Sequence, residues 1–200
     1  MADQLYLNLW FPTFEENQIM PRLMSVVGQL PFSATAPGIG YVAVHPVDWN
    51  QPTLFERTFD FRADPETALY LLRDFIHADY AYEVEAQWDL WIPQQEGDLD
   101  VTWVLLPQSV RFAANGMEFD AGSYQQDGHI QIDFGLDTAF LCEEAAFTPE
   151  VAARVKSNVH KLVEFTQAVE KNCGTSGRVL WSESEENLAQ KLIAKLQRVQ

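Results

Sequence analysis

The chain has 200 residues, of which 47% are hydrophobic and 12% aromatic, so it can bury one substantial core, and this composition argues against disorder. Its formal net charge of −16, from 29 acidic and 13 basic residues, repels phosphate backbones and anionic lipid surfaces. We therefore expect no nucleic acid and no membrane as a direct ligand. A basic protein partner, a divalent cation or solubility alone would each account for the acidity.

The N-terminal stretch MADQLYLNLWFP has no basic residue where a secretory signal needs one, and Asn8 and Pro12 interrupt its apolar residues. No apolar run approaches the roughly 18 residues that a membrane span requires. We therefore expect a soluble, cytoplasmic protein. Cys142 and Cys173 are far apart and form no CxxC motif, so for a cytoplasmic chain we expect two reduced, buried thiols.

Strands and helices alternate in the first half of the chain. The pattern of apolar residues predicts strands at residues 5–11, 40–47, 53–61 and 80–92. A capping box of Thr13 and Glu16 predicts a helix over 14–29, which Pro21 should kink or divide. Asp64 followed by Pro65 predicts a second helix, up to about residue 76. The resulting order, β-α-β-β-α-β, is that of a ferredoxin-like unit, in which two helices cover one face of an antiparallel sheet.

A long hairpin is expected next, from the strand over 80–92 through a loop over 93–98 into a strand over 99–106. The dipeptide Asn115-Gly116 predicts a further hairpin, between residues 110–113 and 117–121. Additional strands are predicted where Ile130, Ile132 and Phe134 alternate with polar residues and at residues 178–181.

Two helices are expected near the C-terminus. Thr148 and Pro149 predict the start of the longest helix, which should run to about Asn172. Its predicted buried stripe consists of Val151, Val155, Val159, Leu162, Val163, Thr166 and Val169. Ser182 and Glu185 form a capping box for the last helix. We therefore expect a single α+β domain over residues 1–200. Its mainly antiparallel sheet has a ferredoxin-like N-terminal half, is extended by further strands and is covered by two C-terminal helices.

The strand over 80–92 separates two kinds of side chain. Its apolar residues include Tyr82, Val84, Trp88 and Leu90, and its opposite face carries Glu83, Glu85, Gln87 and Asp89. Neighbouring side chains on one strand face are about 7 Å apart, so the sheet gains a row of carboxylates. A solvated antiparallel face is the simpler interpretation, and a cation site or an acid-base site is the alternative. No DxDxDG loop is present, so we expect no metal.

His129, Gln131 and Asp133 form a second polar row. If this strand lies beside the carboxylate strand, His129 or Asp133 can face Glu85 or Asp89, and a histidine near carboxylates is the commonest general base at neutral pH. A histidine at the start of a strand is more often merely exposed. The sequence contains no HExxH, GxGxxG, phosphate-loop or GxSxG motif, so we assign no catalytic residue and no cofactor and leave open whether the protein is an enzyme.

Two of the six tryptophans, Trp49 in a turn and Trp91 out of phase with the apolar face of its strand, are expected to be exposed. The candidate binding residues are therefore Glu83, Glu85, Asp89, Trp91, His129 and Asp133.

Our first hypothesis is a non-catalytic, acidic interaction module that binds a basic protein partner, as an inhibitor or immunity-type protein would. The alternative is a small enzyme or ligand-binding domain with a pocket between sheet and helices, lined by carboxylates and His129. A concave pocket joining Trp91 and His129 would favour the alternative, and a flat open face would favour the first hypothesis. We make no prediction about the oligomeric state.

Overall fold

The structure is a computed structural model that describes residues 3–96, 100–141 and 148–182. Its strands are β1 (Gln4–Trp10), β2 (Ile39–Pro46), β3 (Phe55–Ala63), β4 (Tyr80–Glu96), β5 (Asp100–Asn115), β6 (Ile130–Leu136) and β7 (Gly177–Ser182). Its helices are α1 (Glu16–Val27), α2 (Pro65–Tyr70), α3 (Tyr124–Asp127), α4 (Thr138–Leu141) and α5 (Pro149–Asn172), with 3-10 turns η1 (Arg73–Phe75) and η2 (Phe119–Ala121). This is an α+β fold.

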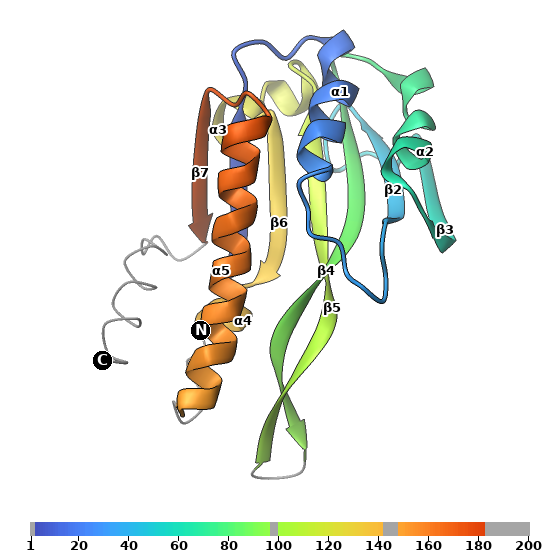
Figure 1. Cartoon of the computed structure of the whole chain (residues 1–200). Coiled ribbons are helices and arrows are strands. Elements are labelled where there is room, and N and C mark those ends of the chain that lie inside the picture. The colour runs from blue at the N-terminus through green and yellow to red at the C-terminus, as the bar shows by residue number, and fades with distance from the viewer. Residues whose placement is uncertain (1–2, 97–99, 142–147, 183–200) are drawn as a thin grey trace.

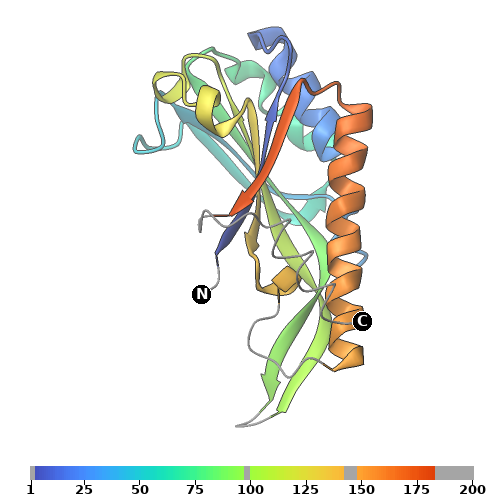
Figure 2. The same ribbon diagram turned by 90° about the vertical axis from the view of Figure 1, so that its left-hand side faces the viewer.

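The strands form one antiparallel sheet of seven strands in the order β3-β2-β4-β5-β6-β1-β7. Helices α1, α2 and α5 cover one face of the sheet (Figure 1). Figure 2 shows the sheet from its side, with α5 on one face and α3 at the upper end of the other. We call the face away from α1, α2 and α5 the open face. The predicted long hairpin is confirmed as β4 and β5, whose far half extends beyond the other strands.

The strand order differs from that of a ferredoxin-like unit, so the predicted ferredoxin-like arrangement of the first half is not confirmed. In such a unit the first strand lies between the third and the fourth. Here β1 pairs with β6 and β7, while β4 pairs with β2 and β5. The predicted order of elements along the chain is confirmed from β1 to β4. Local patterns do not specify which distant strand a strand will pair with, and here β5 and β6 lie between β4 and β1.

Helix α1 begins at Glu16, not at residue 14, and the predicted capping box of Thr13 and Glu16 is wrong. The side chain of Gln18 accepts a hydrogen bond from the N–H of Glu15 instead (3.2 Å). Glu15, the residue before the helix, has an extended backbone (φ −76°, ψ 166°), and Phe14 beside it is buried, with 1% of its surface exposed. The helix continues undivided through Pro21.

The predicted hairpin at Asn115-Gly116 is also wrong, because β5 runs without interruption to Asn115 and the chain then leaves the sheet. Gly116 instead allows a close approach of backbones. Its N–H donates to the carbonyl of Tyr80 (2.9 Å), and a Cβ at this position would lie 2.3 Å from the carbonyl oxygen of Ala78. Any larger residue would therefore collide with main chain.

The predicted phase of β4 is confirmed, since Tyr82, Val84 and Trp88 are fully buried under the helices. The buried stripe of α5 differs in part from the prediction: Val163 is 41% exposed, and Asn158 and Phe165 are buried instead. The helix predicted from Ser182 and Glu185, and the position of Cys142, fall outside the described residues. Cys173 is a buried free thiol, as predicted.

Candidate functional site

The three carboxylates of the predicted row on β4 lie on the open face, because the residues that alternate with them point into the core. They do not crowd together, since each has a separate partner. The contacts are Glu83 Oε2 to His45 Nε2 (3.0 Å), Ser109 Oγ to Glu85 Oε1 (3.0 Å) and the N–H of Ala34 to Asp89 Oδ2 (2.9 Å). The row is therefore a series of cross-linked side chains and not a cluster of repelling charges.

Asp133 lies on the same face, on β6, but does not contact the row directly. Strand β5 lies between, and Arg111 is paired in register with Glu85 on one side and Asp133 on the other. The Arg111 guanidinium donates to Asp133 Oδ2 (3.1 Å). The other carboxylate oxygen of Asp133, Oδ1, accepts hydrogen bonds from the side chain of Gln4 (2.5 Å) and from the N–H of Gly135 (2.8 Å). Asp133 therefore links β6 to both of its neighbours.

His129 is enclosed at the end of the sheet and is 7% exposed, so the simpler expectation of an exposed histidine is wrong. Its ring stacks between Phe14 and Tyr124, with centroid distances of 4.7 and 4.8 Å. Its Nδ1 accepts a hydrogen bond from the N–H of Phe11 (3.0 Å). Burial lowers the pKa of His129, so the ring is neutral at neutral pH, as its acceptor role requires. The ring therefore holds together the segments before α1 and after α3.

Trp91 lies far from His129. Trp91 pairs with Leu105 of β5, while His129 lies beside Asn115 at the end of the same strand, where its carbonyl accepts the N–H of Asn115. Leu105 and Asn115 are ten residues apart, so at about 3.3 Å per residue Trp91 and His129 are separated by about 33 Å along the strand. Trp91 is half-buried against α5, where the guanidinium carbon of Arg154 lies 4.9 Å from the centre of its ring. The predicted site residues thus occupy three separate places. The predicted exposure is confirmed for Trp49, at 41%, but not for Trp91, which is only partly exposed.

A cavity of about 520 Å³ lies on the open face, above β3, β2 and β4. It is lined by Gly40, Tyr41, Thr58, Phe59, Arg62, Glu83 and Glu85. The hydroxyl of Tyr41 donates to Glu56 (3.1 Å). Burial, this bond and the nearby carboxylates raise the pKa of Tyr41 to about 12, so the phenol stays protonated at neutral pH. We call this the open-face cavity.

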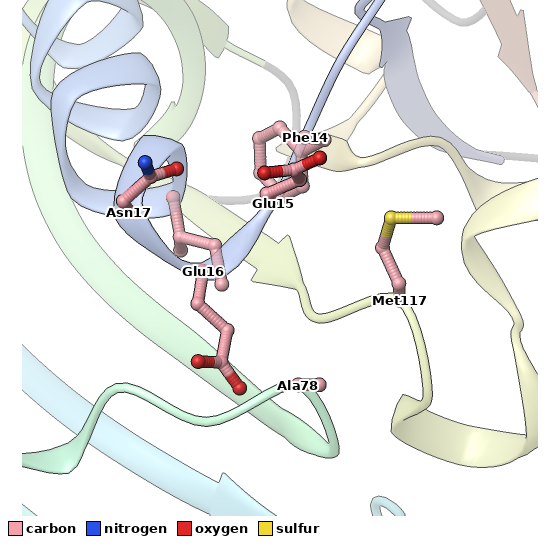
Figure 3. Close-up of a pocket in the computed structure, with 7 residues that line it drawn as sticks. Phe14, Glu15, Glu16, Asn17, Ala78 and Met117 are labelled. Carbon is pink, nitrogen blue, oxygen red and sulfur yellow. The ribbon is translucent and has the colours of Figure 1, made fainter.

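A second cavity, of about 420 Å³, lies at the end of the sheet where β1, β2 and β5 end and β4 and β6 begin. We call this the loop end. The cavity is lined by Phe14, Glu15, Glu16, Asn17, Ile19, Ala78 and Met117. Figure 3 shows Glu16 reaching from the start of α1 toward Ala78, with Met117 on the opposite wall. We call this the loop-end cavity.

The backbone at the loop end is strained. Val47, Asp120 and Ala121 have φ values of 64°, 46° and 53°. A positive φ is a real outlier for a β-branched residue such as Val47, and such strain is often found at functional sites. The carbonyl of Val47 accepts the N–H of Asp120 (2.7 Å), so the strained segments hold one another. Val47 itself is 53% exposed.

Sequence reasoning missed both cavities. Arg62 and Tyr41 are not adjacent to the predicted row along the chain, and the sequence pattern places Met117 in a hairpin strand that does not form. Gly40 was the one signal available, because a glycine in a strand often marks a bulge or a close approach.

Within residues 3–96, 100–141 and 148–182, no group of three or more His, Cys, Asp or Glu side chains is placed to hold a metal ion. None of the helices in this part of the chain is long and apolar enough to cross a membrane. Comparison of the chain with protein-family models, with curated proteins and with solved structures finds no match.

Proposed function

We propose that the protein is a non-catalytic, acidic interaction module that binds a basic protein partner at its loop end, as an inhibitor or immunity-type protein does. One observation carries this proposal. The loop-end cavity joins an apolar wall, formed by Phe14, Ile19 and Met117, to the carboxylates of Glu15 and Glu16 (Figure 3).

This combination suits a lysine or arginine side chain, which has an aliphatic stem and a cationic head. The stem would contact Met117, whose flexible thioether adapts to different partners. The head would pair with Glu15 or Glu16. In the part of the chain that the structure describes, neither carboxylate forms an ion pair, so both are available to a cation from a partner.

The surface around the cavity supports the proposal. Val47, Trp49 and Met117 are 53%, 41% and 40% exposed at this end of the molecule. Trp and Met are enriched at protein interfaces. The neighbouring acids Asp48, Glu118 and Asp120 add negative charge, and a net charge of −16 would steer a basic partner toward the molecule.

The alternative hypothesis receives less support from this geometry. It needs Glu85, Asp89, His129 and Asp133 to converge between the sheet and the helices. The three carboxylates lie on the open face, and the His129 ring is enclosed by Phe14 and Tyr124. These positions favour an interaction module over a pocket built from the four residues.

Affinity capture from a lysate of the source cells tests the proposal. The immobilised wild-type protein should retain a basic protein that salt elutes, because surface charge pairs are screened by salt. Glu15→Gln/Glu16→Gln should lose this protein. Glu66→Gln/Glu164→Gln, which removes the same charge from exposed positions on α2 and α5, should retain it. Equal capture by the two double variants, or no specific capture by the wild type, would refute the proposal.

A further inference from the structure

The open-face cavity is shaped by a bulge in the edge strand β3. Between the pairs Tyr41↔Thr58 and Ile39↔Ala63, β3 contains four residues, 59–62, opposite the single residue Gly40 of β2. Bulges re-aim side chains, and they are frequent next to binding sites. Here the bulge leaves Phe61 92% exposed.

Arg62, the last residue of the bulge, lies over Gly40. A Cβ built on Gly40 would be 2.8 Å from Arg62 Nη1 and 3.1 Å from its Cζ, so the absence of a side chain makes room for the guanidinium. Nη1 is buried and has no hydrogen-bond acceptor among the described residues. A guanidinium cannot lose its proton, and a buried charged donor without an acceptor is unfavourable. The rest of the Arg62 side chain is partly exposed and lines the cavity, so the cavity contains a guanidinium whose charge no described acceptor neutralises.

Two anions line the same cavity without pairing with this cation. Glu83 and Glu85 each bond one neighbour, His45 and Ser109, through one oxygen, and no ion pair with Arg62 forms in the described part of the chain. Their second oxygens have no hydrogen bond to any described residue. The cavity wall therefore carries one cation and two separate anions. A ligand with one carboxylate and two cationic groups would complement these charges.

We propose that the open-face cavity binds a free basic amino acid of the lysine or arginine type. Arg62 pairs with its α-carboxylate, and Glu83 and Glu85 receive its two cationic groups. The two carboxylates and one guanidinium sum to −1, which a ligand of net charge +1 neutralises. The volume of about 520 Å³ falls within the usual range of small-molecule sites, about 300–1,000 Å³. The hydroxyls of Tyr41 and Thr58 supply further polar contacts. This site is independent of the loop-end cavity.

Isothermal titration calorimetry with L-lysine and L-arginine as probes tests the proposal. We expect saturable binding of at least one of them to the wild-type protein. Two analogues separate the contacts: 1,5-diaminopentane lacks the carboxylate of lysine, and L-norleucine lacks its side-chain ammonium. Each should bind at least about tenfold more weakly than lysine, since each loses one charge-assisted contact. No saturable binding of either amino acid up to about 10 mM, or equal binding of the diamine, overturns the proposal.

Variants locate the site. Arg62→Gln should weaken binding at least about tenfold. Gly40→Ala should have a similar effect while keeping the arginine, because its Cβ displaces the flexible guanidinium. The control Arg73→Gln changes an exposed arginine of η1, and Glu15→Gln/Glu16→Gln alters the loop-end cavity; both should leave the affinity unchanged. Unchanged affinity in Arg62→Gln and Gly40→Ala, with folding verified by circular dichroism, refutes the assignment.

Discussion

Replacing Trp88 with alanine tests how the core of the sheet is built. Trp88 is fully buried and stacks on Phe134 of β6 at a centroid distance of 5.3 Å. It also meets Phe165 of α5 edge-on at 6.3 Å. The indole therefore joins β4, β6 and the longest helix, and its removal should weaken the packing of all three.

The expected cost follows from these contacts. A buried tryptophan removes about 200 Å² from water, which at about 25 cal/mol per Å² stabilises the fold by about 5 kcal/mol. The ring contacts with Phe134 and Phe165 add about 0.5–1.5 kcal/mol each. The buried indole N–H has no acceptor among the described residues, and this unpaired donor reduces the stabilisation by about 1–3 kcal/mol. These contributions sum to about 3–7 kcal/mol for the whole side chain. Alanine keeps the Cβ and the site relaxes in part, so Trp88→Ala should lower the free energy of unfolding by roughly 3–5 kcal/mol, a large part of the usual 5–15 kcal/mol.

Urea unfolding followed by far-UV circular dichroism measures this change. Trp88→Phe is the matched control, because it keeps an aromatic ring and removes the unpaired N–H, and it should cost less than about 1.5 kcal/mol. Asp89→Ala, on the open face, loses one hydrogen bond from Ala34 and should cost about 0.5–1.5 kcal/mol. If Trp88→Ala is as stable as the wild type, the assignment of the two faces of β4 is refuted.

Three further predictions concern the helix contact, the enclosed histidine and the close backbone approach. Asn158→Ala should cost roughly 3 kcal/mol in urea unfolding, because the Asn158 side chain accepts the N–H of Trp91 (2.9 Å) and donates to the carbonyls of Trp91 (2.7 Å) and Ala139 (2.8 Å), so that three backbone groups lose a partner. Burial lowers the pKa of His129, so the unfolded chain binds its proton more readily than the folded protein. The contribution of the neutral His129 ring to the free energy of unfolding is fully present above the pKa of an unfolded histidine, about 6.5. It is lost as the pH falls below that value, by up to about 1.4 kcal/mol per pH unit, and unfolding measurements from pH 7 to 5 detect the loss. Gly116→Ala should cost about 1–3 kcal/mol, because its Cβ would approach the carbonyl oxygen of Ala78 to 2.3 Å; thermal unfolding measures the loss.

Each of these has its own control. Ser157→Ala, at the exposed neighbour of Asn158, should leave stability within about 0.5 kcal/mol, and an equal loss in both variants would contradict a role for the amide. His129→Gln should have a shallower dependence of stability on pH than the wild type, and identical slopes would exclude His129 as the titrating group. Gly122→Ala tests strain from a positive φ of 82° without a backbone clash, and a smaller loss at Gly116 than at Gly122 would argue against the close approach.

The sequence alone determined which side of β4 is buried and part of the buried side of α5. The alternation of Tyr82, Val84 and Trp88 with acids predicted the two faces of β4, because a strand exposes alternate residues to opposite sides. Helix starts were equally local: Asp64 and Thr148 accept N–H groups three residues ahead, as their positions before prolines predicted. These features depend on residues within a few positions of one another, so their patterns are visible in the chain.

Tertiary structure decided the rest. The pairing of β1 with β6 rather than β4 depends on which strand edges meet, and no local pattern encodes that choice. The enclosure of His129 by Phe14 and Tyr124 is also invisible in the alternation around it. The two cavities arise in the same way: Met117 and Phe14 line one, and Arg62 and Glu85 line the other, because distant segments of the chain lie side by side. Periodicity specifies the buried side of an element, while a site requires knowing which elements are neighbours, and that follows from packing the whole chain at once.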